Sequence, residues 1–263
     1  AWRPPSKLAN RRPDVFETVP PRRYSWRVSV ISPTRAGQRE WIALGVLMLP
    51  VLLVSVDNTV LSFALPEISQ ELRPTGNQLM WIVDLYALML AGLLIAMGSL
   101  GDRIGRRKLL IIGLIGFGLG SAPGALSTSA AMVKVARARL GFFGATLMPS
   151  TLSLIRNIFT NDRDRRLAIA TWAAMFSGGA VLGPVVGGYL LEHFWWGSVF
   201  LINVPLIIVF IPAALAVIPE SKDPNPGRFD PISIVLSLAV MVPLVFAIKH
   251  GASHGLDDIV LAS

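Results

Sequence analysis

The sequence predicts an all-α integral membrane protein built as a bundle of transmembrane helices. Apolar residues make up 53% of the 263 positions and charged residues only 15%, against roughly 25% charged in a typical soluble domain. Such a chain cannot bury its apolar surface in one globule, so a bilayer is its expected solvent. Helix is the expected form because open strands in lipid leave backbone groups without partners. Seven apolar runs of about membrane-spanning length have the approximate limits 41–66, 79–100, 108–126, 129–154, 166–190, 198–218 and 231–249.

The distribution of charge predicts the orientation of these spans. Most of the 24 Lys and Arg residues lie in residues 1–40 and in the loops near positions 105, 160 and 225. The loops between them carry almost no basic residues. Under the positive-inside rule the N-terminus is cytoplasmic and the end of the seventh span is external. Tryptophans, which prefer the membrane interface, stand near span ends at Trp41, Trp81, Trp195 and Trp196.

The expected organisation has three parts. Residues 1–40, rich in Pro and Arg, are expected to form a disordered basic cytoplasmic tail, and they lack the apolar core of a secretory signal. Residues 41–218 are expected to form a six-helix transmembrane bundle. Residues 219–263 are expected to hold a cytoplasmic linker and a seventh transmembrane helix. Because the net charge of +8 is explained by this placement, nucleic acid is not an expected partner; a tail that binds nucleic acid or lipid headgroups is the less favoured interpretation.

Several classes of site are excluded by composition. The chain has no Cys, and its three His residues show no ligand spacing, which removes disulfide scaffolds, thiol catalysis and Cys-based metal sites. The glycines of residues 98–108 follow no strand and precede no Walker lysine, so a nucleotide site is not indicated. No Ser/His pattern or pair of catalytic carboxylates appears. The chain is not expected to be an enzyme or to hold a cofactor.

Three ionisable residues inside spans are the candidate proton- or cation-binding residues. Asp57 lies in an otherwise uncharged run, and a carboxylate at mid-helix costs about 2.5–3.5 kcal/mol on insertion scales, so a function is the default hypothesis. Counted at about 1.5 Å per residue, Asp57 is roughly 13 Å below a helix end at Pro66, Arg137 about 12 Å deep and Asp84 about 8 Å deep. The depths are similar, whereas the helix rotations stay open. A structural pairing of Asp57 with Arg137 or with the backbone is the alternative.

A buried carboxylate and a cation suggest a chemistry. Desolvation raises the pKa of a carboxylate in general, and a bound cation favours its ionised form. A proton and a cationic drug would therefore compete for Asp57 and Asp84. Trp81 and Tyr86 are candidate cation–π contacts for a lipophilic cation, with interfacial anchoring as the alternative. Asp84, near the start of its helix, is alternatively stabilised by the helix dipole.

The fourth span contains three basic residues with different expectations. Arg137 shares a glycine-lined face with Gly141 and Gly144, which allows close helix approach. Lys134 lies on that face too and is expected to snorkel towards the outer surface. Arg139 points about 200° away and has no evident partner. In the sixth span, Asn203 is interpreted as a structural residue that hydrogen-bonds across helices or shapes a cavity.

Two glycine-containing segments carry further expectations. In residues 98–108, Asp102 and Arg106 are spaced to pair with each other or with neighbouring helix ends, and the glycines allow a sharp turn between helices. In residues 179–188, glycines recur every four residues and form a flat contact ridge. Pro184 removes one backbone donor there, so a kink is expected.

These segments resemble the motifs of a known family. Residues 98–108 resemble the loop signature of the major facilitator superfamily, with Gly101 where Ala is usual. Residues 179–188 and 137–145 are similar to its fifth-span antiporter motif and its fourth-span motif. Three further segments are similar to the fourteen-span drug–proton antiporter branch: 57–66, 81–86 and 200–205. The resemblance implies a six-helix N-terminal half with a 3+3 inverted repeat, one additional transmembrane helix, and a missing C-terminal half as partner.

The resemblance also implies a function for the whole parent protein. It implies proton-coupled efflux of lipophilic cationic drugs and antiseptics across the plasma membrane, the inner membrane of a bacterium, powered by the proton gradient. Arg137 is implied in proton relay, and the fifth-span motif in favouring exchange over leak. The implied gate and antiporter residues are Gly98, Asp102, Arg103, Gly105 and Arg106, and Gly179, Gly183, Pro184, Gly187 and Gly188. A facilitator for a lipid, sugar derivative or siderophore, and a non-transporting membrane fragment, stay open as alternatives.

Overall fold

The computed structural model describes residues 35–223, 236 and 239–240. All regular structure in this part is helical, which confirms the all-α prediction. The elements are α1 (Gln38–Leu72), α2 (Gly76–Ile104), α3 (Arg106–Ala125), α4 (Ala130–Ile158), α5 (Asp162–His193), α6 (Ser198–Leu201) and α7 (Asn203–Val217). The expected tail 1–40 and seventh span 231–249 lie almost wholly outside the described residues.

The first helix is longer at both ends than its apolar run. It begins at Gln38, inside the segment expected to be a disordered tail, and continues through Pro66 to Leu72. A helix end at Pro66 was therefore a wrong prediction, because one proline removes a single backbone donor and the polar residues beyond it continue the helix. At about 1.5 Å per residue, Asp57 lies roughly 22 Å from the Leu72 end. The run of apolar residues marks only the part of the helix that suits the hydrocarbon core of a membrane, and not the polar turns at its ends.

The sixth predicted span is divided into two helices. The short α6 ends at Leu201, and α7 begins at Asn203 after a turn at Ile202. Pro205 falls in the first turn of α7, where its missing N–H is not needed. The break places the Asn203 side chain at the start of a helix inside the bundle, where it is 2% exposed.

Side-chain caps explain where three of the helices begin. Thr75 accepts from the Gln78 N–H at 3.3 Å, and the Gln78 side chain accepts from the Thr75 N–H at 3.0 Å. Ser129 accepts from the Met132 N–H at 3.3 Å, and Asn161 accepts from the Arg163 N–H at 3.0 Å. Each cap supplies an acceptor to an N–H that has no partner within its own helix. Short polar residues after a loop thus fix the starts of α2, α4 and α5.

Among the described helices, α4 differs from the other long ones in composition. By length and apolar composition, α1, α2, α3, α5 and α6–α7 together are able to cross a membrane. The helix α4 carries Lys134, Arg137 and Arg139 and does not meet that criterion, although it packs along both α2 and α3. Its central charge, Arg137, is 1% exposed. Hydropathy alone therefore undervalues a helix whose polar groups are satisfied inside a bundle.

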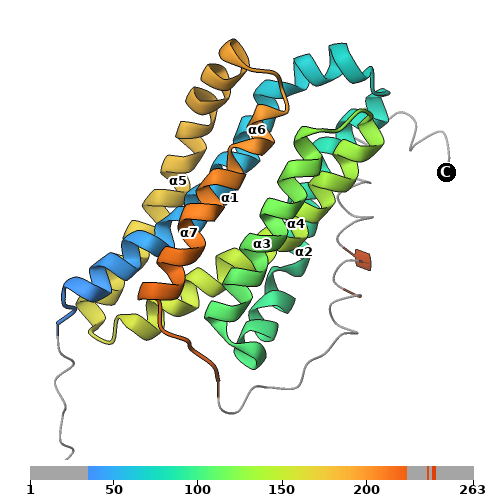
Figure 1. Cartoon of the computed structure of the whole chain (residues 1–263). Helices are drawn as coiled ribbons and strands as arrows, with labels where there is room; N and C mark the ends of the chain where they lie inside the picture. Colours follow the sequence, from blue (N-terminus) through green and yellow to red (C-terminus); the bar gives the residue numbers. More distant parts are fainter. Residues whose placement is uncertain (1–34, 224–235, 237–238, 241–263) are drawn as a thin grey trace, which may run out of the picture. The chain divides into compact units, whose positions relative to one another are not determined.

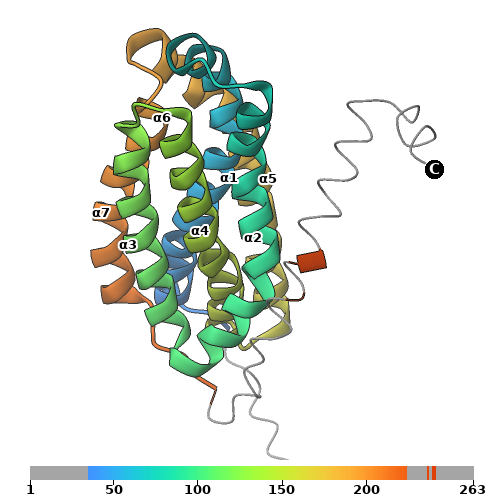
Figure 2. The same ribbon diagram turned by 90° about the vertical axis from the view of Figure 1, so that its right-hand side faces the viewer.

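Apart from the short α6, the helices lie in two groups. One group contains α5, α1 and α7, and the other contains α2, α4 and α3 (Figure 1); α7 also packs against α3, beside which it lies in Figure 2. The first helix of each predicted repeat packs along the second helix of the other: α1 lies against α5, and α4 lies against α2. This reciprocal pairing is what the predicted 3+3 inverted repeat requires.

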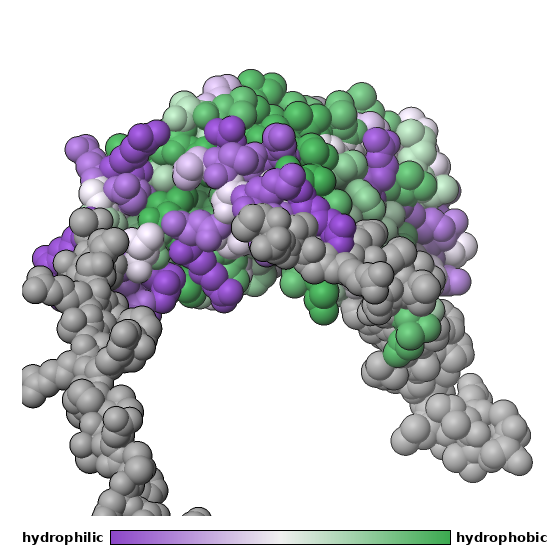
Figure 3. Space-filling view, turned by 90° about the horizontal axis from the view of Figure 1, so that it is seen from below, coloured by the Kyte–Doolittle hydropathy of each residue, from purple (hydrophilic) through white to green (hydrophobic). Residues whose placement is uncertain are grey.

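The expected cytoplasmic loops all meet at one end of these helices. The Ala36 N–H donates to Asp164 at 2.9 Å, and the Arg106 N–H donates to the Ser221 carbonyl at 2.8 Å. Hydrophilic residues cover much of this end, which is the lower end in Figure 1 and faces the viewer in Figure 3. At the opposite end the Trp196 indole donates to Glu71 at 2.7 Å.

Candidate functional site

A buried ion pair lies between the two groups of helices. Arg137 on α4 donates from Nη1 to Asp57 Oδ2 on α1 at 2.9 Å, and both side chains are 2% exposed. Arg137 also donates from Nε to the carbonyl of Ile82 on α2, at 3.3 Å. Two of the three predicted ionisable residues are therefore in direct contact, whereas the sequence left their helix rotations open.

The second carboxylate oxygen of Asp57 is held by an amide. Asn203 Nδ2 on α7 donates to Asp57 Oδ1 at 3.0 Å and lies 3.2 Å from the Ser121 hydroxyl on α3. Asp57 thus accepts from a charged donor on one oxygen and a neutral donor on the other. The hydrogen bond across helices expected of Asn203 is present, and it ends on the central carboxylate. We refer to Asp57, Arg137, Asn203, Ser121 and Tyr86 as the central network.

Tyr86 covers the arginine of this network. Its ring lies below the Arg137 guanidinium, with 4.2 Å from Arg137 Cζ to the ring centroid. Its hydroxyl donates to the Val54 carbonyl at 3.3 Å, and the residue is 1% exposed. The ring that the sequence suggested for a substrate cation contacts an internal cation instead. The network therefore links α1, α2, α3, α4 and α7.

Asp84 and Trp81 lie elsewhere on α2. Both are half-buried. Asp84 is two residues from both Ile82 and Tyr86, which contact Arg137, so it is rotated about 200° from each of them around the helix. It stands on a different face of α2 from the one that meets the central network. Contacts of Asp84 and Trp81 with a substrate stay a prediction.

The fifth-span glycines form a close seam with α1. A Cβ atom on Gly183 would lie 1.8 Å from the Thr59 hydroxyl oxygen, and one on Gly179 would lie 2.6 Å from the Ser55 Cβ. On Gly187 it would lie 3.1 Å from a Val60 methyl group. Gly188, by contrast, has open space around it. Gly179 and Gly183 thus leave no room for a side chain against the helix that carries Asp57, and the contact at Gly187 is tight. Pro184 lies within a continuous α5.

The signature loop contacts the segment that follows α7. Arg106 pairs with Asp102, and the Asp223 N–H donates to the Asp102 carbonyl at 3.1 Å. The Arg107 N–H donates to Glu220 at 3.0 Å. Gly105 has φ of 110°, and a Cβ there would lie 2.7 Å from a Glu220 oxygen. Arg107 Nη1 also donates to the Ile218 carbonyl at 3.0 Å. We call these residues the loop cluster. Gly98 lies one turn inside α2 from it, and Arg103 is half-buried.

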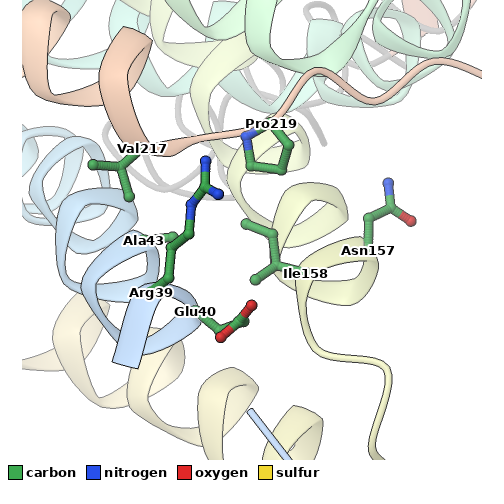
Figure 4. A pocket seen from close by; sticks show the side chains of 7 residues that line it. All are labelled: Arg39, Glu40, Ala43, Asn157, Ile158, Val217 and Pro219. Atoms are coloured by element: carbon green, nitrogen blue, oxygen red, sulfur yellow. The ribbon is translucent and has the colours of Figure 1, made fainter. Parts of the chain in front are cut away.

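Two pockets flank the network at different levels. A pocket of about 310 Å³ lies between α1, α5 and α7. Its walls are apolar except for Asn203, which joins it to the central network. A second pocket, of about 320 Å³, opens at the hydrophilic end between α1, α4 and α7 and has the polar side chains of Arg39, Glu40 and Asn157 on its walls (Figure 4). Only the first adjoins the buried charges.

Similarity to known proteins identifies the family of this chain. The profile of the Major Facilitator Superfamily matches residues 47–252. The chain belongs to the Major Facilitator Superfamily. The matched region contains the central network, the loop cluster and the α5 seam, as expected for the N-terminal half of a facilitator. The chain is a multi-pass membrane protein.

Named facilitators similar to this chain are associated with drug export or resistance. The multidrug efflux pump LfrA of Mycolicibacterium smegmatis is 58% identical over 226 residues, which cover 86% of this chain and 45% of LfrA. The methyl viologen resistance protein SmvA of Salmonella typhimurium is 41% identical over 80% of this chain and 43% of SmvA. The tetracenomycin C resistance and export protein of Streptomyces glaucescens is 35% identical, over 84% of this chain and 41% of that protein. The chain spans less than half the length of each relative.

Sequence reasoning undervalued two residues of the facilitator's centre. Asn203 was interpreted as structural, although an amide in an apolar span is a weak pointer to a buried polar partner. Ser121 was not singled out, because small hydroxyl residues are common at helix contacts in membranes. Their joint contact with Asp57 arises only when α1, α3 and α7 come together.

Proposed function

We propose that this facilitator half belongs to an exporter of lipophilic cationic drugs that exchanges them for protons, and that it is a transporter rather than an enzyme. The observation that carries the proposal is the ion pair of Asp57 and Arg137, which is buried at mid-helix and contacts Ile82, Asn203 and Tyr86. A charge pair this far from water is costly to maintain. The similarity to drug-export and drug-resistance proteins supports efflux as the function of the protein that contains this ion pair.

The proposed exchange depends on the charge of Asp57. A proton on Asp57 removes the negative charge that holds Arg137, so the contact between α1 and α4 weakens. Arg137 then keeps its contacts with Ile82 and Tyr86 on α2. A positively charged drug favours the ionised carboxylate and thus proton release. Proton and drug binding are mutually exclusive on this account, which is the requirement for antiport.

The apolar pocket between α1, α5 and α7 supports a lipophilic substrate. Its volume of about 310 Å³ is at the lower end of the range for small-molecule sites. Asn203 is shared between this pocket and Asp57. A guest in the pocket is therefore positioned to disturb one of the two side chains that hold the carboxylate. Trp81 and Asp84 are proposed as contacts on another face of α2.

The remaining assignments concern gating and orientation. The loop cluster joins the α2–α3 turn to the segment after α7, and we propose that it acts as a latch that opens during transport. The close α5–α1 seam is proposed to limit leak. The basic end of the bundle is proposed to be cytoplasmic, with the protein in a bacterial inner membrane. The proton gradient is the proposed energy source, without a cofactor.

Efflux of a fluorescent lipophilic cation such as ethidium tests the proposal. The full-length transporter is expressed in a pump-deficient host, and efflux is measured with and without a protonophore. We expect the protonophore to stop efflux, and Asp57→Asn to lower it at least about tenfold, since the exchangeable charge is lost. The matched control is Glu67→Gln, a carboxylate ten residues further along α1 and only half-buried, which is expected to retain efflux.

Two results would reject the antiport mechanism. One is efflux by Asp57→Asn at the wild-type rate. The other is wild-type efflux that persists without a proton gradient. Protein abundance in the membrane is measured for each variant, so that a folding defect is separated from a transport defect.

A further inference from the structure

Arg139 presents a cation on the outward face of α4 that the proposed exchange does not use. It is exposed, unlike Arg137 two residues earlier. Within the part of the chain that the structure describes, its side chain forms no hydrogen bond or ion pair. The exposed residues near it on the same helix are apolar: Met132, Val135 and Phe142. A permanent charge on such a surface in a bilayer requires a counter-charge or water.

A groove adjoins this arginine. It has a volume of about 270 Å³ and is lined by Gly120 and Pro123 of α3 and by Met132, Val135 and Arg139 of α4; we call it the Arg139 groove. A Cβ on Gly120 would lie 3.6 Å from the Arg139 Cβ. The arginine side chain therefore leaves the helix at the seam between α3 and α4. Lys134, on the same helix, does not line the groove.

The groove extends from Arg139 towards the Ala130 end of α4. Arg139 lies nine positions after Ala130, about 13 Å along the helix axis. Side chains of a helix tilt towards its N-terminus, so the Arg139 side chain leaves α4 in the direction of that membrane interface. This is the direction in which a long basic side chain snorkels. The nearest abundant anions there are lipid phosphates.

We propose that the Arg139 groove binds an anionic phospholipid of the leaflet at the Ala130 end, with its phosphate on Arg139 and the start of an acyl chain along Val135 and Met132. The planar guanidinium offers paired donors that match phosphate oxygens. The apolar walls of the groove suit an acyl chain. Charge complementarity and the apolar lining therefore select the same ligand. The inference depends only on the membrane setting of the bundle and not on proton exchange.

Native mass spectrometry of the intact protein tests this site. The protein is purified from nanodiscs that contain equal amounts of phosphatidylglycerol and phosphatidylcholine, and the retained lipids are counted. We expect preferential retention of phosphatidylglycerol, and Arg139→Gln to weaken it about fivefold, the effect of one basic residue near a membrane surface. Lys134→Gln is the matched control, a cation on the same helix outside the groove, and is expected to change retention less than about twofold.

Further variants keep the test decisive if Arg139→Gln folds poorly. Arg139→Lys retains the charge and is expected to bind phosphatidylglycerol better than Arg139→Gln. Val135→Trp fills the groove without changing any charge, and it is expected to lower retention. Equal retention in the wild type and in Arg139→Gln overturns the proposal; this is also the result expected if another segment of the protein supplies the counter-charge. An equal loss in Lys134→Gln overturns it as well.

A competition arm separates a lipid from a soluble anion. Inorganic phosphate at millimolar concentration is expected to leave the retained phosphatidylglycerol unchanged, because it cannot use the apolar part of the groove. Displacement by inorganic phosphate would mean that Arg139 is a simple anion site. That outcome overturns the assignment to a phospholipid.

Discussion

The centre of the bundle and its hydrophilic end are both joined by charged side chains, but the two regions differ in their exposure to water. In the central network, Asp57 and Arg137 are each 2% exposed and 2.9 Å apart. In the loop cluster, Arg107 and Glu220 are 30% and 28% exposed, and their side chains are 3.9 Å apart. A buried charge that loses its partner is strongly penalised, whereas a charge near water is resolvated. Losing one partner is therefore expected to cost much more free energy at the centre than at the hydrophilic end.

The largest expected effect is the removal of the central cation. Arg137→Gln leaves Asp57 buried beside a neutral side chain and is expected to lower the unfolding free energy by about 3–5 kcal/mol. The measurement is an SDS-unfolding titration followed by tryptophan fluorescence. The double variant Asp57→Asn/Arg137→Gln removes both charges and is expected to regain part of the loss while staying inactive in efflux. A loss below about 1 kcal/mol for Arg137→Gln would contradict a tightly paired centre.

An intermediate effect is expected at the α5–α1 seam, which has no room for a side chain. Gly183→Ala places a methyl group against Thr59 and is expected to cost about 1–3 kcal/mol through overpacking. The same titration measures it. Gly188→Ala is the matched control because open space surrounds that position, and it is expected to be neutral or slightly stabilising. Combining Gly183→Ala with Thr59→Ala is expected to restore much of the loss; without such recovery the seam is not the cause.

The smallest effect is expected in the loop cluster. Glu220→Gln removes the charge opposite Arg107 but keeps an oxygen for the Arg107 N–H, so the expected loss is about 0–1 kcal/mol. Raising the salt concentration from about 0.05 to 0.5 M is expected to reduce the difference from wild type, because exposed pairs are screened. The titration is repeated at both concentrations. A salt-independent loss as large as that of Arg137→Gln would remove the contrast between the two regions.

Some features of the fold and of the candidate site follow from sequence patterns, and others do not. The helical class, the order of the spans and the membership of Asp57 and Arg137 in the candidate site follow from apolar runs interrupted by rare charges. The α5 ridge follows from glycines spaced by four. The extension of α1 through Pro66 does not, because a proline marks a helix end only as a tendency. The division of the sixth span at Ile202 left no distinct pattern in an apolar segment.

Side-chain partners required the tertiary structure. Asp57 and Arg137 are 80 positions apart, and Asp57 and Asn203 are 146 positions apart, so their contact depends on the crossing and rotation of three helices. The stacking of Tyr86 on Arg137, rather than on a ligand, depends on the same rotations. The sequence alone determined which residues are costly in a membrane, because cost depends on the chemistry of one residue. Only the packing of helices decided which groups offset that cost, because hydrogen bonds depend on distance and direction between segments that the linear order does not relate.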